Sequence, residues 1–120
     1  MTREDEVRER RITMEIVVDA YTEDERITGW HCYLEENLEF AFTARCISEH
    51  PLSPLLTGDE VEVIQMAPIE DCEGGMMVEA EWLEDDLLLP LEQLEGVGVE
   101  EGTREAVEDW HYWVAQGYGF

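Results

Sequence analysis

Oxygen-bearing side chains crowd one short stretch of this 120-residue chain in a pattern that suits a calcium ion. Glu35, Glu36, Asn37 and Glu39 stand close together, at the expected end of a helix. Ca²⁺ binds about six to eight oxygens from carboxylates, amide carbonyls, backbone and water. The last carbonyls of a helix add partial negative charge, so the acids are destabilising there unless a cation is present. The cluster predicts a metal site, the alternative being an ordinary solvated acidic surface.

A second cluster, Glu70, Asp71 and Glu73, lies in an expected loop that continues into Gly74 and Gly75. Glycines let the backbone turn its carbonyl oxygens toward a metal, so this loop is a second, weaker candidate site. A third acidic run covers residues 84–86, where a tight hairpin turn explains the composition without a ligand.

The spacing of Asp24, Gly29 and Glu35 matches the first, sixth and twelfth positions of an EF-hand loop. The third position, however, is Arg26, a cation where a ligand should stand. The residues between have the apolar spacing of a continuous helix. We therefore reject an EF-hand.

Motifs for catalysis or zinc binding are missing from the sequence. No GxSxG, Walker A, GxGxxG or HExxH pattern occurs, and His50 and His111 have no nucleophile beside them, so we expect no enzyme. The three cysteines, Cys32, Cys46 and Cys72, are far apart and lack ligand spacing. They predict small buried side chains rather than disulfides or a zinc site.

Charge is the strongest bulk constraint, because 31 Asp and Glu face seven Arg and no Lys, for a formal net charge of −24. A nucleic-acid ligand or an anionic membrane would need a basic surface, so neither is an expected partner. Two interpretations remain, a cation-binding surface and adaptation to a salty cytosol. No apolar run is long enough to span a membrane, and the charged N-terminus does not resemble a signal peptide. We expect a cytoplasmic monomer.

Hydrophobic periodicity predicts one domain, residues 1–120, of the α+β class. Helices are expected at about 3–20, 23–37 and 103–116, and short strands between about 40 and 94. About four to five antiparallel strands joined by tight turns suggest a small SH3-like β-barrel, flanked by N-terminal helices and a C-terminal helix.

Local signals refine this prediction. Thr22 and Glu25 read as a capping box that starts the second helix. Gly29 inside that helix is unfavourable by about 1 kcal/mol relative to Ala, so we expect another segment to pack closely there. The buried faces predicted for the second and last helices are Ile27, Trp30, Leu34 and Leu38, and Val107, Trp110 and Val114, respectively.

Several segments of the chain form a recognisable series, of which the most distinctive is Glu105-Ala-Val-Glu-Asp-Trp-His-Tyr-Trp113. The others are residues 15–21, 25–26, 29–30, 33–35, 38–40, 54–55, 58, 61–63, 66–67, 90–91 and 94. In their order and spacing these segments resemble the cyanobacterial-type, CcbP-like calcium-binding protein family. The likeness covers nearly the whole chain after the first ten residues.

This resemblance implies a small protein that binds Ca²⁺ outside any EF-hand and acts as a calcium buffer or signalling component. It also implies a compact barrel with flanking helices, and a ligand among the acids of residues 34–40.

Two other functions are compatible with the residues. One is an SH3-like protein-interaction module whose acidity reflects salt adaptation, docking a partner through the barrel or through Trp110, Tyr112 and Trp113. Core packing is the alternative explanation for those aromatics. The other is a nucleic-acid mimic, which would require the acids to lie in a row like phosphates.

Overall fold

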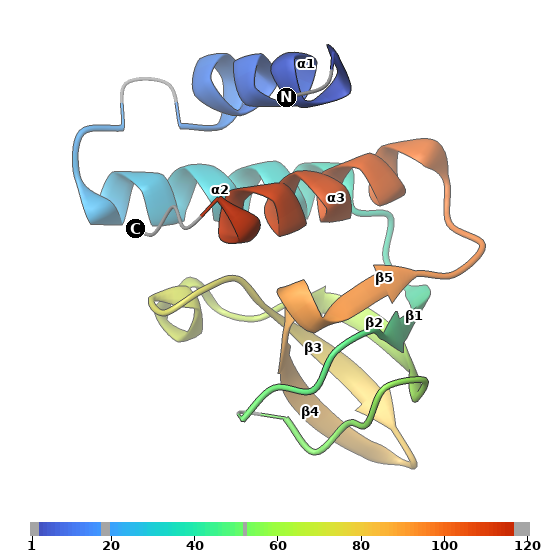
Figure 1. The fold of residues 1–120 in the computed structure, drawn as a ribbon. Coiled ribbons are helices and arrows are strands. Elements are labelled where there is room, and N and C mark those ends of the chain that lie inside the picture. The colour runs from blue at the N-terminus through green and yellow to red at the C-terminus, as the bar shows by residue number, and fades with distance from the viewer. Residues whose placement is uncertain (1–2, 18–19, 52, 117–120) are drawn as a thin grey trace.

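The protein is layered, with helices stacked over one antiparallel sheet (Figure 1). The computed structural model describes residues 3–17, 20–51 and 53–116. Helix α1 (Arg3–Arg11) is outermost, and helices α2 (Glu23–Asn37) and α3 (Glu101–Ala115) lie side by side between α1 and the strands. The strands are β1 (Phe42–Cys46), β2 (Glu60–Met66), β3 (Met77–Trp82), β4 (Asp85–Pro90) and β5 (Leu94–Gly96).

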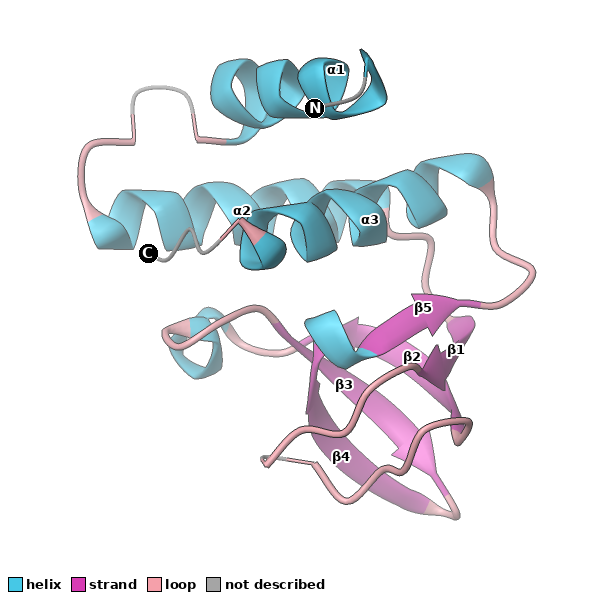
Figure 2. Cartoon of the chain, viewed as in Figure 1, coloured by secondary structure: helices cyan, strands magenta, loops and turns pink. Residues whose placement is uncertain are grey.

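The five strands pair in the order β4-β3-β2-β1-β5, all antiparallel. The predicted α+β class and antiparallel strands are therefore confirmed, but the sheet is open rather than a closed barrel (Figure 2). Its edges are β4 and β5. Between them the chain makes a 3-10 turn at Leu91–Gln93 and crosses to the opposite edge, where the three residues of β5 pair with β1.

The predicted N-terminal helix is shorter than expected. Helix α1 ends at Arg11 and continues as one π-helical turn, Ile12–Ile16, before the chain bends at Val17. The β-branched residues here disfavour a longer helix. The rest of the predicted range, residues 18–19, lies outside the described residues. The Thr22 cap is confirmed, since its Oγ1 accepts a hydrogen bond from the Glu25 backbone N–H at 3.2 Å.

The core lies between the sheet and the α2–α3 layer. All four residues predicted for the inner face of α2 are buried, as are Val107 and Trp110 of α3. The prediction that Val114 is buried is wrong, because 38% of this residue is exposed and Trp113 takes the inner position. The rings of Trp110 and Trp113 lie 5.0 and 5.5 Å from that of Trp30, which fixes the face that α3 turns inward.

Two strand boundaries differ from the prediction. The first strand begins at Phe42, two residues late, and the acidic run 84–86 is only partly a turn. Leu83 and Glu84 form the hairpin turn with positive φ, while Asp85 and Asp86 already belong to β4. No described helix is both long and apolar enough to cross a membrane.

Candidate functional site

The first predicted cluster does not converge on one point. Glu35 and Glu36 are exposed in the last turn of α2, where consecutive side chains point in different directions. Glu35 Oε2 lies 4.0 Å from His31 Nδ1, and the Asn37 amide donates to the Tyr33 carbonyl oxygen at 2.8 Å. Asn37 therefore closes the end of the helix, and its side-chain Oδ1 is the atom left for a cation.

Glu39 takes part in a different arrangement, which we call the acidic hollow. Its backbone N–H donates to Thr103 Oγ1 at 3.0 Å, which fixes the segment after α2 against the start of α3. Glu39, Glu62 of β2 and Glu100 before α3 line a cavity of about 280 Å³. The remaining lining residues are Ala41, Phe42, Thr43, Val97, Gly98, Val99 and Thr103. The hollow thus combines three carboxylates, two hydroxyls and backbone, with no basic side chain.

A row of carboxylates continues from the hollow across the outer face of the sheet. Strand register places Thr43 opposite Glu62, Glu62 opposite Glu81, and Glu81 opposite Asp86. Directly opposed like charges destabilise a sheet. The neighbouring row is partly neutralised, because Arg45 lies 3.6 Å from Glu60 and 3.3 Å from Glu95. The row from Glu62 to Asp86 has no basic residue. A cation from solution would therefore reduce the repulsion between its carboxylates.

The second predicted cluster lies on a short 3-10 turn, Ile69–Cys72, with Glu73 at its end. Glu70, Asp71 and Glu73 are all exposed. Cys72 anchors the turn: it is buried, and the Met77 backbone N–H donates to its Sγ at 3.4 Å. Burial raises the pKa of the Cys72 thiol, so it stays neutral and serves as packing. Across the described ranges, no three Asp, Glu, His or Cys side chains lie close enough to hold a metal ion.

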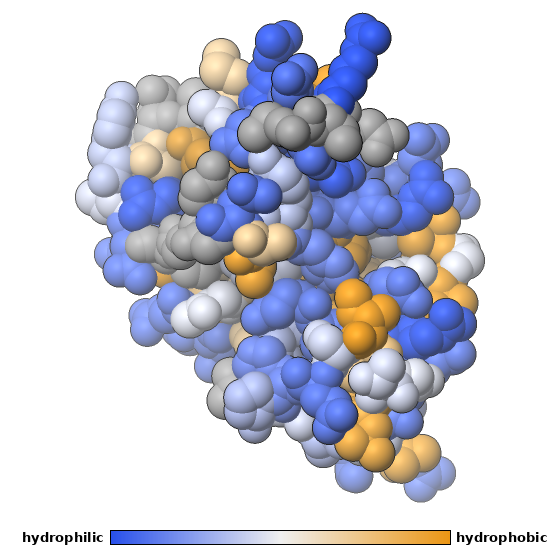
Figure 3. Space-filling model, viewed as in Figure 1, coloured by the Kyte–Doolittle hydropathy of each residue, from blue (hydrophilic) through white to orange (hydrophobic). Residues whose placement is uncertain are grey.

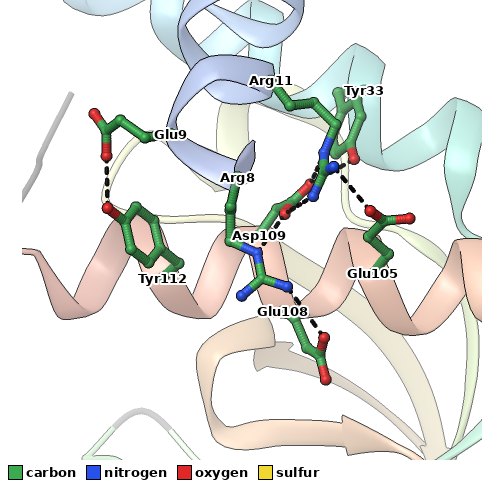
Figure 4. A network of polar contacts seen from close by, with 8 residues as sticks. All are labelled: Arg8, Glu9, Arg11, Tyr33, Glu105, Glu108, Asp109 and Tyr112. Carbon is green, nitrogen blue, oxygen red and sulfur yellow. Dashed lines mark hydrogen bonds and ion pairs between the residues drawn. The ribbon is translucent and has the colours of Figure 1, made fainter. Parts of the chain in front are cut away.

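The best-connected carboxylate is Asp109 of α3, which the sequence did not single out as a charge centre (Figure 4). It is fully buried and accepts hydrogen bonds from Arg8 Nε at 2.8 Å, Arg11 Nη2 at 2.6 Å and the Tyr33 hydroxyl at 2.7 Å. Around it, Arg8 pairs with Glu108 at 3.2 Å and Arg11 with Glu105 at 2.8 Å. This network attaches α1 and α2 to α3. No side chain described in α1 is buried, and its one apolar residue, Val7, is 56% exposed.

The network shifts two protonation equilibria. The hydrogen bonds to Asp109 raise the pKa of Arg11 above its ordinary value, so its guanidinium is charged at any working pH. Burial, together with the hydrogen bond to Asp109, raises the pKa of Tyr33 well above that of a free phenol. Because both pKa values are raised, Arg11 and Tyr33 keep the protons that they donate to Asp109.

The ionisation of Tyr33 should reduce the stability of the protein at alkaline pH. Its pKa is raised in the fold, so its contribution to stability is complete below the unfolded value of about 10 and is lost as pH rises above it. The loss has a slope of up to about 1.4 kcal/mol per pH unit. The free energy of unfolding, measured with denaturant at pH 8–11.5, should therefore fall more steeply with rising pH for the wild type than for Tyr33→Phe. Equal slopes would show that Tyr33 does not resist ionisation.

The aromatic residues of α3 are mostly core residues. Trp110 and Trp113 are 2% and 8% exposed, and Tyr112 donates to Glu9 Oε2 at 2.7 Å. This burial disfavours the predicted partner-docking role of that helix. Hydrophilic residues cover most of the face seen in Figure 3, and its apolar residues are scattered.

The two histidines considered as lone bases have structural partners. His50 Nε2 lies 3.6 Å from Glu92, whose carboxylate also accepts from Trp110 Nε1 at 3.2 Å. His111 Nε2 lies 3.4 Å from the Leu91 carbonyl oxygen. These contacts fasten the 3-10 turn Leu91–Gln93 to α3.

Comparisons with known proteins identify close relatives. A family model for the CcbP type, described as "Calcium binding", matches residues 10–114. "The crystal structure of Anabaena CcbP" is 39% identical, with a TM-score of 0.87, and the match covers 100% of this chain and 98% of that one. "Calcium binding protein in the calcium-binding form" is 37% identical, also with a TM-score of 0.87, over 100% of both chains. Curated protein sequences give no significant match.

Proposed function

Because the chain belongs to the CcbP calcium-binding family, we propose that it is a non-enzymatic Ca²⁺-binding protein that works in the cytoplasm as a calcium buffer or signalling component. The observation that supports this most directly is the acidic hollow, in which segments distant in sequence bring three carboxylates to one cavity. Its oxygen donors are of the type that Ca²⁺ prefers.

The proposed primary ligands are Glu39, Glu62 and Glu100, which line the hollow but lie too far apart in this structure to hold one ion, so their side chains would have to move inward on binding. Hydroxyl or backbone oxygens of the hollow and water would complete the site. A cavity of about 280 Å³ has room for the ion with part of its hydration shell. Glu39 is the member of the predicted cluster that lines it. Glu35, Glu36 and Asn37 stay predicted ligands on the adjoining end of α2, and Glu70, Asp71 and Glu73 stay a second, weaker candidate.

Charge neutralisation is the proposed mechanism. Carboxylates of one sign repel each other when the ion is absent, and Ca²⁺ would draw them together while joining the end of α2 to β2 and the start of α3. Ca²⁺ would then stabilise the fold by about 2.7 kcal/mol at a concentration 100 times the Kd. A calcium buffer needs only to bind the ion. A signalling component would also need a partner that recognises the Ca²⁺-stabilised form.

Calorimetric titration with Ca²⁺ in high-potassium buffer, with excess Mg²⁺ as a competitor, tests the proposal. Wild type should bind saturably in the presence of Mg²⁺. Glu39→Gln and Glu100→Gln should each weaken binding roughly tenfold or more, since even groups behind the ligands typically contribute that much. The control is Glu23→Gln, which makes the same charge change at the opposite end of α2 and should alter the Kd less than twofold.

Glu36→Gln separates the two placements of the site. A large loss with Glu36→Gln and none with Glu39→Gln would move the ligands to the end of α2. Weak heats that do not saturate and vanish with added salt, in wild type and all variants, would refute calcium binding. The acids would then be a salt-adapted coat, and the SH3-like interaction module would be the better hypothesis.

A further inference from the structure

A groove between α1 and α3 gathers most of the arginines of this acidic molecule. It has a volume of about 410 Å³ and is lined by one face of α1 and one face of α3. The lining residues are Arg3, Val7, Arg8, Arg11, Glu101, Arg104, Glu105 and Glu108. Four of the chain's seven basic residues therefore meet at one place, although acids outnumber them 31 to seven.

The arginines divide into two groups. All three nitrogens of the Arg11 guanidinium are used, Nε and Nη2 by Asp109 and Nη1 by Glu105. Arg8 uses Nε and Nη2 for Asp109 and Glu108. Arg3 and Arg104 make no ion pair within the described part of the chain, and both are exposed.

The carboxylates of the groove are mostly committed. Glu105 and Glu108 already neutralise Arg11 and Arg8, and only Glu101 lines the groove without an ion pair among the described residues. The uncommitted charges are thus two guanidinium groups against one carboxylate, with one N–H side of Arg8 in addition. Arg8 and Arg11 together face Glu105, Glu108 and the buried Asp109, so the groove as a whole is close to neutral in a chain of net charge −24, and among the described residues its free N–H donors belong mainly to Arg3 and Arg104.

We infer that this groove is a binding site for a small tetrahedral oxyanion of the sulfate or phosphate class, held by Arg3 and Arg104. Guanidinium groups present planar pairs of N–H donors that match such oxygens. The net charge of −24 does not prevent this, because exposed charges beyond about 8 Å are largely screened at physiological ionic strength. The carboxylates around the rim exclude a long polyanion, so the ligand is a small one.

Sulfate in calcium-free buffer is the probe, with potassium chloride adjusted to constant ionic strength. The arginine Nε–H resonances of ¹⁵N-labelled protein report on each side chain. Arg3 and Arg104 should shift saturably with sulfate, and Arg104→Gln should weaken that binding at least tenfold. The control is Arg26→Gln, since Arg26 lies on α2 and is not part of the groove. Arg3→Gln provides a second variant that disturbs no described contact.

The results distinguish the site from general charge screening. Shifts that grow linearly with sulfate, or that Arg26→Gln reduces as much as Arg104→Gln, would overturn the inference. Arg104→Lys should retain part of the affinity, because it keeps the charge but loses the planar pair of donors. No Ca²⁺ is present, so this outcome is independent of the proposed calcium site.

Discussion

Replacing Asp109 by Asn should lower the free energy of unfolding by about 3 kcal/mol, which corresponds to a fall in Tm of roughly 10 °C. Asp109 is fully buried, and its two oxygens accept from Arg8, Arg11 and Tyr33. Asn is similar in size, but its amide group presents donors toward donors. The two guanidinium groups, each about one-fifth exposed, would lose their shared counter-charge.

Glu108→Gln is the matched control. Glu108 also pairs with Arg8, at 3.2 Å, but half of its side chain is exposed to solvent. Exposed ion pairs contribute less than about 1 kcal/mol, so this variant should unfold almost like wild type. Urea unfolding at neutral pH, followed by tryptophan fluorescence, measures both. If the two variants lose equal stability, or if Asp109→Asn loses none, the network does not hold α1 to α3 as the contacts indicate.

Local features of this fold follow from the sequence. The spacing of Ile27, Trp30, Leu34 and Leu38 predicts the buried face of α2, and Thr22 predicts where that helix starts. Both depend on residues within about one or two turns of each other. The family match over residues 10–114 also confirms the resemblance identified from the segment order.

Contacts between distant segments could not be predicted in this way. Glu39, Glu62 and Glu100 meet because β1 and β2 pair in a particular register and α3 begins beside the end of α2. Among 31 acids, no local pattern distinguishes Glu62 or Glu100 from their solvated neighbours. Asp109 stands out in the sequence only as one acid of the segment 105–113, because its arginine partners lie about a hundred positions away.

The positions of the arginines show which acidic residues lack a positive partner, and this indicates a cation site better than the number of acids does. Arg8 and Arg11 neutralise the buried Asp109, and Arg45 partly neutralises the row that contains Glu60 and Glu95. Three of the seven arginines thus lie at these two places. The hollow and the row that continues from it to Asp86 receive none. An ion from solution is the simplest way to balance them, which is why the hollow is the place to test first.

Gly29→Ala should destabilise the protein by about 2 kcal/mol, although Ala favours a helix over Gly by about 1 kcal/mol. A Cβ at this position would clash with the carbonyl oxygen of Ile16. This oxygen belongs to the backbone, so it cannot move aside as a flexible side chain would. The π-helical turn would have to move away from α2, and with it Ile12 and Ile16, which are 1% and 4% exposed and are the apolar attachment of the N-terminal segment.

Gly102→Ala provides the opposite expectation in the same chain. Gly102 is also helical, but no described atom from another segment lies within 4 Å of an added Cβ, so the substitution should be neutral or stabilising by up to about 1 kcal/mol. Chemical unfolding of both variants therefore separates close packing from helix propensity, because the two predictions differ in sign. A Gly29→Ala protein as stable as wild type would mean that the N-terminal segment does not rest on α2. Its attachment would then depend on the arginines around Asp109, and Gly29→Ala should leave the effect of Asp109→Asn unchanged.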